Sequence, residues 1–157
     1  MTRLRGRALR GRRLHAQAPA GHWGTTTMIS SIRFDGSTAC LILEGATDTQ
    51  VFRTYVQKVL LPTLRPGDIV VMDNLTPHQN QQTLALIREA GAEALFLPAY
   101  SPDLNPIEKM WSKVKNRLRS LEARTAEELH TAIATALAEV TAKDAAAWFA
   151  SCGYSFI

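Results

Sequence analysis

The sequence feature that most constrains the fold is a short apolar run that ends in an acid and an amide. Residues 69–72 read Ile-Val-Val-Met, and Asp73 and Asn74 follow directly. Four consecutive apolar residues of this kind are typical of a strand buried on both faces, as in a parallel sheet. Asp73 would then lie at the carboxyl end of the strand, which is where open α/β sheets bind their ligands.

The surrounding segments predict alternating strands and helices. Residues 25–33 and 39–43 predict the two strands of a hairpin, with Asp35 as a residue of the turn between them. The remaining patterns predict a second buried strand at 94–97 and helices at 48–64, 76–91, 106–121, 125–140 and 141–149, the second of which begins with a capping-box glutamine, Gln79. Right-handed crossovers would bring the ends of strands 69–72 and 94–97 to one edge of a parallel sheet. The loop after residue 97 should therefore converge with Asp73.

A second acid, Glu108, stands in the first turn of the helix predicted at 106–121. Asn105 fits the N-cap and Pro106 the first helical position, so Glu108 is at the third. One interpretation is a variant capping box, in which Glu108 only binds a backbone N–H. The other is that Asp73 and Glu108 meet and hold a divalent cation, because neighbouring carboxylates otherwise repel each other. Mg²⁺ or Mn²⁺ suits ligands that are all oxygens.

Other polar residues lie near these acids. Asn74 adjoins Asp73, and His78 is within reach of the same edge, where it could contact a phosphate or a carboxylate or remain a surface histidine at a helix start. At 100° per residue, Lys115 and Arg119 fall within about 20° of Glu108 on the helix. This face is either solvated or a strip that contacts DNA phosphates next to the acids.

Positive charge is concentrated in the first 23 residues, which hold six arginines and no acidic residue, whereas the whole chain has a net charge of +4. The arginines, which could contact several phosphates of DNA, are Arg3, Arg5, Arg7, Arg10, Arg12 and Arg13. The alternative for such a charge run is a solvated terminus.

Length and composition indicate an ordinary globular domain. The chain has 157 residues, 46% of them hydrophobic and 20% charged, which is enough for a hydrophobic core. No run of about 18 apolar residues and no apolar segment after the arginines is present, so we expect neither a membrane span nor a secretory signal. Cys40 and Cys152 lack the spacing of a disulfide framework or a thiolate zinc site. We therefore expect a cytoplasmic protein.

Two strings carry a resemblance to a known family. They are Val-Val-Met-Asp-Asn-Leu at 70–75 and Leu-Pro-Ala-Tyr-Ser-Pro-Asp-Leu-Asn-Pro-Ile-Glu-Lys-Met-Trp at 97–111. With 34 residues between Asp73 and Glu108, this pattern resembles the catalytic domain of bacterial insertion-sequence transposases of the mariner-like superfamily. The likeness extends from about Thr2 to Tyr154.

The resemblance implies a ribonuclease H-like mixed α/β sheet flanked by helices. It also implies an Asp-Asp-Glu site with Asp73 and Glu108 as the second and third acids. In that family two Mg²⁺ or Mn²⁺ ions flank the phosphate, and the same site cuts the transposon end and joins it to target DNA. The implied setting is the bacterial cytoplasm, in association with the nucleoid.

One departure from the family concerns the first catalytic Asp. In the family it ends a strand just before the segment that resembles residues 2–8, so we expect a chain that lacks this Asp and its central strand. The expected organisation is one catalytic domain over 1–157, with a basic arm at 1–21, an α/β core at 22–122 and C-terminal helices at 123–157. Two further functions stay open. One is a non-catalytic remnant that binds DNA or the full-length transposase and modulates it. The other is half of a split enzyme completed by a separate upstream fragment.

Overall fold

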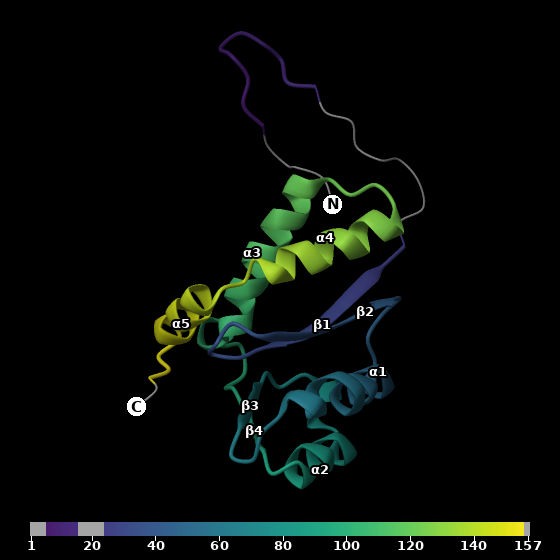
Figure 1. Cartoon of the computed structure of the whole chain (residues 1–157), viewed down its shortest axis with the longest axis vertical. Coiled ribbons are helices and arrows are strands. Elements are labelled where there is room, and N and C mark those ends of the chain that lie inside the picture. Colours follow the sequence, from purple (N-terminus) through teal and green to yellow (C-terminus); the bar gives the residue numbers. More distant parts are fainter. Residues whose placement is uncertain (1–5, 16–23, 156–157) are drawn as a thin grey trace. The chain divides into compact units, whose positions relative to one another are not determined.

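The computed structural model describes residues 6–15 and 24–155, and they form a mixed α/β protein (Figure 1). The chain divides into two compact units. The larger unit contains residues 24–110 and 140–155, and the smaller contains 111–139 with the described part of residues 1–23. Both acids of interest, Asp73 and Glu108, belong to the larger unit.

The strands of the larger unit form two separate two-stranded sheets. β1 (Thr26–Ile32) pairs antiparallel with β2 (Thr38–Glu44), which confirms the predicted hairpin. β3 (Ile69–Met72) pairs parallel with β4 (Glu93–Phe96), which confirms the predicted parallel neighbours. The single mixed sheet of the prediction is not found within 24–155, because each of the four strands has one partner there.

The hairpin turn is built as the sequence predicts. Asp35 Oδ1 accepts hydrogen bonds from the Ser37 N–H at 2.9 Å and from Ser37 Oγ at 2.6 Å. These bonds lower the pKa of the Asp35 carboxyl. Asp35 is therefore a turn residue.

The helix predicted at 48–64 is helical but not uniform. α1 (Thr49–Tyr55) begins at Asp48, whose Oδ1 accepts from the Val51 N–H at 2.8 Å. It continues as a π-helical turn, Val56–Leu60, and a 3₁₀ turn, Leu61–Thr63. Pro62 has no N–H to donate to the carbonyl four residues back, and its ring crowds that carbonyl. The prediction of a regular α-helix to residue 64 was therefore wrong for the last two turns.

The helix predicted at 76–91 is in fact two elements. A 3₁₀ turn, η3 (Thr76–Gln79), precedes α2 (Gln81–Glu89). Asn80 between them has extended backbone, and its Oδ1 accepts from the Thr83 N–H at 3.1 Å, so this better N-cap starts the α-helix. Gln79 makes no capping box, because its Nε2 donates instead to the Asn74 carbonyl at 2.9 Å.

The core of the larger unit lies between the β3–β4 sheet and the helices α1 and α2, which Figure 1 shows beside that sheet. Its buried members are Phe52, Tyr55, Val56, Leu60, Met72, Leu84, Ile87 and Ala92. On the opposite face of β3, Ile69 keeps 61% of its surface exposed, and Leu95 of β4 keeps 50%. The prediction that strand 69–72 is buried on both faces was therefore wrong, since this core covers only the face that carries Met72.

Two helices complete the larger unit. α3 (Pro106–Leu121) begins in it as predicted and continues without a break into the smaller unit. α5 (Ala142–Ser151) is capped by Thr141 and Asp144, each of which binds the other's backbone N–H. The predicted helices at 106–121 and 141–149 are therefore confirmed.

The smaller unit joins α3 to α4 (Ala126–Ala138), which begins with a capping box formed by Thr125 and Glu128. Glu139 after α4 binds α3 twice: Lys113 Nζ donates to its carbonyl, and Arg117 Nε pairs with its carboxylate, both at 2.7 Å. Across the described ranges, no helix has both the length and the apolar character that a membrane span requires.

Candidate functional site

Asp73 lies directly after β3, as the sequence predicts, and its side chain is 47% exposed. Oδ1 accepts from the Leu75 N–H at 3.2 Å and pairs with His78 Nδ1 at 2.7 Å. Within residues 6–15 and 24–155, Oδ2 has no protein partner. One oxygen of this carboxylate is thus held by the protein, and the other is available to a ligand.

His78 is positioned by the core as well as by Asp73. Its side chain is 20% exposed, and its ring centroid lies 4.3 Å from that of Phe52, which is 4% exposed. The ring packing restrains the imidazole while Nδ1 meets the carboxylate. The structure thus places His78 against a carboxylate, one of the contacts expected from the sequence.

Asn74 fastens the two parallel strand ends together. Its Nδ2 donates to the Leu97 carbonyl, and the Leu97 N–H donates to the Met72 carbonyl at 2.8 Å. Gln79 then binds the Asn74 carbonyl. The loop that leads to Glu108 therefore departs from the same sheet edge that carries Asp73.

The loop after Leu97 contains a tyrosine in an uncommon conformation. Tyr100 has φ of 59°, a region that residues with a Cβ seldom adopt, and its side chain is fully exposed. A short 3₁₀ turn, η4 (Pro102–Leu104), follows and ends at Asn105. Sequence reasoning did not single out Tyr100 as a structural feature, because nothing in its residue type signals a positive φ.

Glu108 is not used as a capping-box acid. Asn105 Oδ1 accepts from the Ile107 N–H at 3.4 Å, but the Asn105 N–H, which a capping-box acid would bind, donates to the Pro102 carbonyl at 3.1 Å. Glu108 is exposed, and among the residues described its carboxylate has no hydrogen-bond or ion-pair partner. This differs from α4 and α5, where the acid at the same helical position does close the box. These contacts do not bear out the capping interpretation of Glu108, and they leave its interpretation as a metal ligand a prediction.

The donor chemistry of these acids suits a hard divalent cation, since both offer carboxylate oxygens free of protein donors. Within the described ranges no three His, Cys, Asp or Glu side chains gather into a group that could hold a metal ion. Two carboxylates alone supply fewer ligands than such a cation takes.

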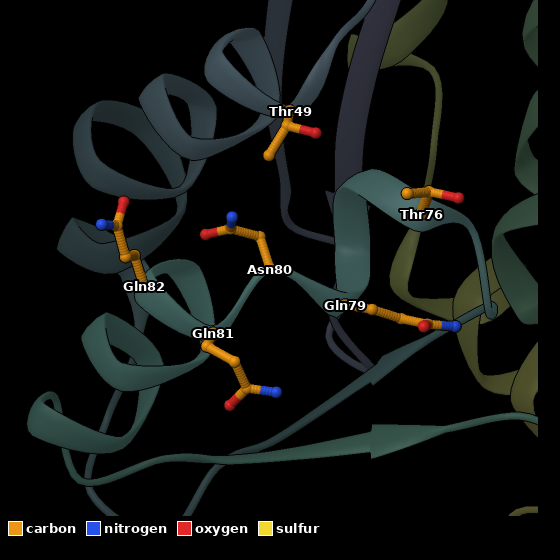
Figure 2. Close-up of a pocket in the computed structure, with 6 residues that line it drawn as sticks. All are labelled: Thr49, Thr76, Gln79, Asn80, Gln81 and Gln82. Atoms are coloured by element: carbon orange, nitrogen blue, oxygen red, sulfur yellow. The ribbon is translucent and has the colours of Figure 1, made fainter.

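A polar hollow of about 580 Å³ lies beside this region, at the starts of α1 and α2 (Figure 2). Its lining residues are Thr49, Thr76, Gln79, Asn80, Gln81 and Gln82. None of these side chains is charged, so the hollow offers no carboxylate to a divalent cation. It borders the Asp73 region through Gln79, whose amide reaches the Asn74 carbonyl.

The predicted DNA-binding cations are exposed where the structure describes them. Arg7, Arg10, Arg12 and Arg13 all lie in an exposed stretch, whereas Arg3 and Arg5 lie outside the described residues. On α3, Lys115 is exposed, and Arg119 is partly exposed with Nη1 donating to Asn116 Oδ1 at 3.0 Å. These positions leave the cations accessible to an anionic partner.

One contact near Glu108 was missed altogether. Tyr154 Oη donates to the Leu104 carbonyl at 3.0 Å, which ties the end of the chain to the loop before α3. The two residues are 50 positions apart, and no periodicity or spacing in the sequence signals their contact.

Comparison with known proteins gives a consistent picture. A sequence model described as DDE superfamily endonuclease matches residues 1–130. The transposable element Tcb1 transposase of Caenorhabditis briggsae is 28% identical over 112 residues, which cover 68% of this chain and 41% of that protein. The transposable element Tc1 transposase of Caenorhabditis elegans is 27% identical over 107 residues, which cover 67% of this chain and 38% of that protein. The chain thus spans about two fifths of the length of these relatives.

Proposed function

Because the chain belongs to the DDE superfamily endonucleases, we propose that it is the catalytic domain of a transposase that cuts transposon ends and joins them to target DNA. The main observation in support is that Asp73 and Glu108 are both accessible to a ligand. Asp73 follows a strand at the edge from which the Glu108 loop departs, and both carboxylates keep oxygens free of protein donors. The mixed α/β architecture is consistent with a ribonuclease H-like domain of this family.

DDE endonuclease domains generally use divalent metal ions, and Asp73 and Glu108 are our candidates for the ligands of Mg²⁺ or Mn²⁺. Such a cation stabilises the charge of the phosphate under attack and activates the attacking oxygen. Asp73 would offer Oδ2 to the cation, since its Oδ1 contacts His78 and Leu75. Glu108 contributes a carboxylate that its helix does not require for capping.

His78 and Asn74 support this site without joining it. His78 fixes the rotation of the Asp73 carboxylate by holding Oδ1, and Phe52 fixes His78 in turn. Asn74 holds the start of the Glu108 loop against the end of β3 through the Leu97 carbonyl. Both residues therefore act on the spacing of the two acids.

A third carboxylate would complete the Asp-Asp-Glu set of the family. The two sheets leave edges at which a strand could pair, because within 24–155 β1 pairs only with β2 and β3 only with β4. A strand that ends in Asp can pair with these free edges by main-chain hydrogen bonds and bring its acid next to Asp73. We include this strand, the central one of a ribonuclease H-like sheet, in the proposal.

DNA is the proposed partner, as transposon end and as target. Exposed Arg7, Arg10, Arg12 and Arg13 of the basic arm (1–21) and Lys115 and Arg119 on α3 would contact phosphates rather than read base sequence. The core (22–122) would carry the acids and the C-terminal helices (123–157) would support it. Origin in a bacterial insertion sequence and association with the nucleoid belong to the same proposal.

A second function is favoured by one observation: the described residues gather no three metal ligands. In this alternative the chain binds DNA or a full-length transposase and modulates it without cutting. If instead the chain is half of a split enzyme, a separately encoded upstream fragment would supply the strand and restore cutting. An added strand should therefore restore cutting in a split enzyme and have no such effect in a modulator.

The deciding experiment adds that strand. We expect the chain, fused behind a segment of strand pattern that ends in Asp, to nick duplex DNA when Mg²⁺ or Mn²⁺ is present. Nicking should disappear in Asp73→Asn and in Glu108→Gln and persist in Asp103→Asn, a control acid in the exposed loop before Glu108. Salt-dependent DNA binding without any nicking by the fusion would favour the modulating alternative.

A further inference from the structure

The C-terminal segment binds the loop that precedes Glu108. Tyr154 Oη donates to the carbonyl of Leu104, the last residue of η4, two residues before α3 begins. Inside the loop, η4 is held by short-range bonds, from the Leu104 N–H to the Ser101 carbonyl at 3.2 Å and from the Asn105 N–H to the Pro102 carbonyl at 3.1 Å. The contact from Tyr154 therefore adds an anchor from a distant part of the sequence.

Tyr154 is itself held by aromatic packing and backbone bonding. Its N–H donates to the Phe149 carbonyl at 3.1 Å after a turn at Gly153. Its ring lies edge-to-face with Phe149 at 5.8 Å, and Phe149 lies edge-to-face with Phe34 of the hairpin turn at 5.9 Å. Burial raises the pKa of the Tyr154 hydroxyl, which remains a donor at neutral pH.

The other end of α5 is fixed to the same hairpin turn, which lies beside α5 in Figure 1. A Cβ added at Gly36 would lie 2.7 Å from the Ala142 nitrogen and 2.8 Å from the Thr141 carbonyl carbon, so the turn and the start of α5 are in direct contact. Gly36 also has φ of 86°, which favours glycine. α5 is thus attached to the hairpin at its start, and it carries Tyr154 to the Glu108 loop at its end.

We infer that Tyr154 is a positioning residue for Glu108 and that residues 142–154, which are α5 and the turn after it, act as a clasp. The inference rests on the proposed role of Glu108 as a metal ligand. A hydrogen bond at Leu104 restrains the turn from which α3 starts, and Glu108 stands in the first turn of α3. The clasp follows residues 1–130, the part matched by the family model.

The test compares two substitutions that each remove one hydroxyl. Tyr154→Phe deletes the donor to Leu104, and Tyr100→Phe deletes a fully exposed hydroxyl in the same loop. In Tyr154→Phe we expect amide hydrogen exchange at residues 102–108 to accelerate about threefold to tenfold, the range for one hydrogen bond. Mn²⁺ affinity, read from paramagnetic broadening of the Glu108 amide, should fall by a similar factor. Tyr100→Phe should change neither, and the unfolding midpoint of Tyr154→Phe should fall by no more than the loss of one hydrogen bond explains.

The outcomes separate this inference from the function on which it rests. Unchanged exchange in Tyr154→Phe would overturn the clasp. Faster exchange with unchanged Mn²⁺ affinity would overturn the positioning role, provided that Glu108→Gln does weaken Mn²⁺ binding. If Glu108→Gln leaves Mn²⁺ binding intact, Glu108 is not a metal ligand, and the positioning role of Tyr154 is overturned as well. The exchange result would still show whether Tyr154 restrains the loop at Leu104. Phe149→Leu, which removes the ring under Tyr154, should reproduce the Tyr154→Phe exchange pattern.

Discussion

Asp73 and Glu108 are held in opposite ways. Asp73 follows a strand. Its Oδ1 accepts a hydrogen bond from the Leu75 N–H and pairs with His78 Nδ1, and His78 packs on the buried ring of Phe52. Glu108 is exposed, and its position depends on a loop with a fully exposed tyrosine and a single 3₁₀ turn. The first acid is fixed by its own neighbourhood in the sequence and the core, and the second by contacts brought from elsewhere in the chain.

Because their supports differ, the two ligands of the proposed site can be altered separately. Substitutions in the core of the larger unit should disturb Asp73, because His78 links Asp73 to that core. Changes at the loop or the clasp should disturb Glu108. A substitution near one acid should therefore leave the other acid unchanged. A substitution that disturbs both acids equally would show that their supports are not separate.

The largest effect is expected from Phe52→Ala. The ring is 4% exposed and supports both the core and His78, so its loss should lower the free energy of unfolding by about 3 to 5 kcal/mol. Urea denaturation measures the loss, and the His78 ring resonances should shift as the stacking partner is lost. Phe34→Ala, at a ring that is 42% exposed, should cost clearly less. Equal losses in the two variants would contradict the assignment of Phe52 to the support of Asp73.

A smaller effect is expected where the chain enters β3. Arg33, which follows β1, binds Asp68 with both terminal nitrogens, at 2.6 and 2.8 Å, and the Arg65 N–H also donates to this carboxylate at 2.8 Å. The hydrogen bonds from Arg33 lower the pKa of Asp68 below its usual value of 3.8. Both side chains are partly exposed, so Asp68→Asn should cost about 1 kcal/mol at neutral pH.

The pH dependence of that loss follows from the sign of the shift. A carboxyl whose pKa is lower in the folded state stabilises the fold above its unfolded pKa, and the stabilisation is lost as the pH falls through the folded value. The difference between wild type and Asp68→Asn should therefore be constant above about pH 5 and shrink below pH 3.8. A difference that persists unchanged into the acid range would show that the carboxylate charge is not what binds Arg33.

The smallest effect on stability is expected from Glu108→Ala, and Glu128→Ala is its comparison. Glu128 stands at the third position of α4 and accepts from the backbone N–H groups of Arg124 and Thr125. These bonds lower the pKa of Glu128. Glu128→Ala should therefore lower the free energy of unfolding measurably at neutral pH, and less so below pH 4.5. Glu108→Ala should leave the free energy of unfolding nearly unchanged. A larger loss for Glu108→Ala would restore the capping interpretation.

The sequence predicted those parts of the fold that depend on local patterns. The β-branched segments around Asp35 and the capping residues Thr125 and Thr141 act within a few positions, and their elements were confirmed. The run at 69–72 correctly predicted a strand that ends at Asp73. Its burial was overestimated because burial depends on what packs on each face, which an apolar run does not specify.

The errors arose where two local signals compete or where distant residues meet. Asn80 caps α2, so the α-helix begins later than the predicted residue 76, and Pro62 altered the end of the first helix. At the candidate site, the identities of Asp73 and Glu108 followed from sequence and resemblance, but their supports did not. The His78–Phe52 stack joins residues 26 positions apart, and the Tyr154 contact with Leu104 spans 50.

We propose that Asp73 and Glu108 are ligands of one divalent cation, and a Mn²⁺ titration can show whether they are. Paramagnetic broadening of the amides at 73–75 and 107–109 would be followed in wild type, Asp73→Asn, Glu108→Gln and the control Asp103→Asn. We predict that Mn²⁺ broadens both segments of the wild type together, that Asp103→Asn behaves like the wild type, and that either of the other changes weakens binding about tenfold or more at both segments. Equal Mn²⁺ binding by wild type, Asp73→Asn and Glu108→Gln would contradict the claim.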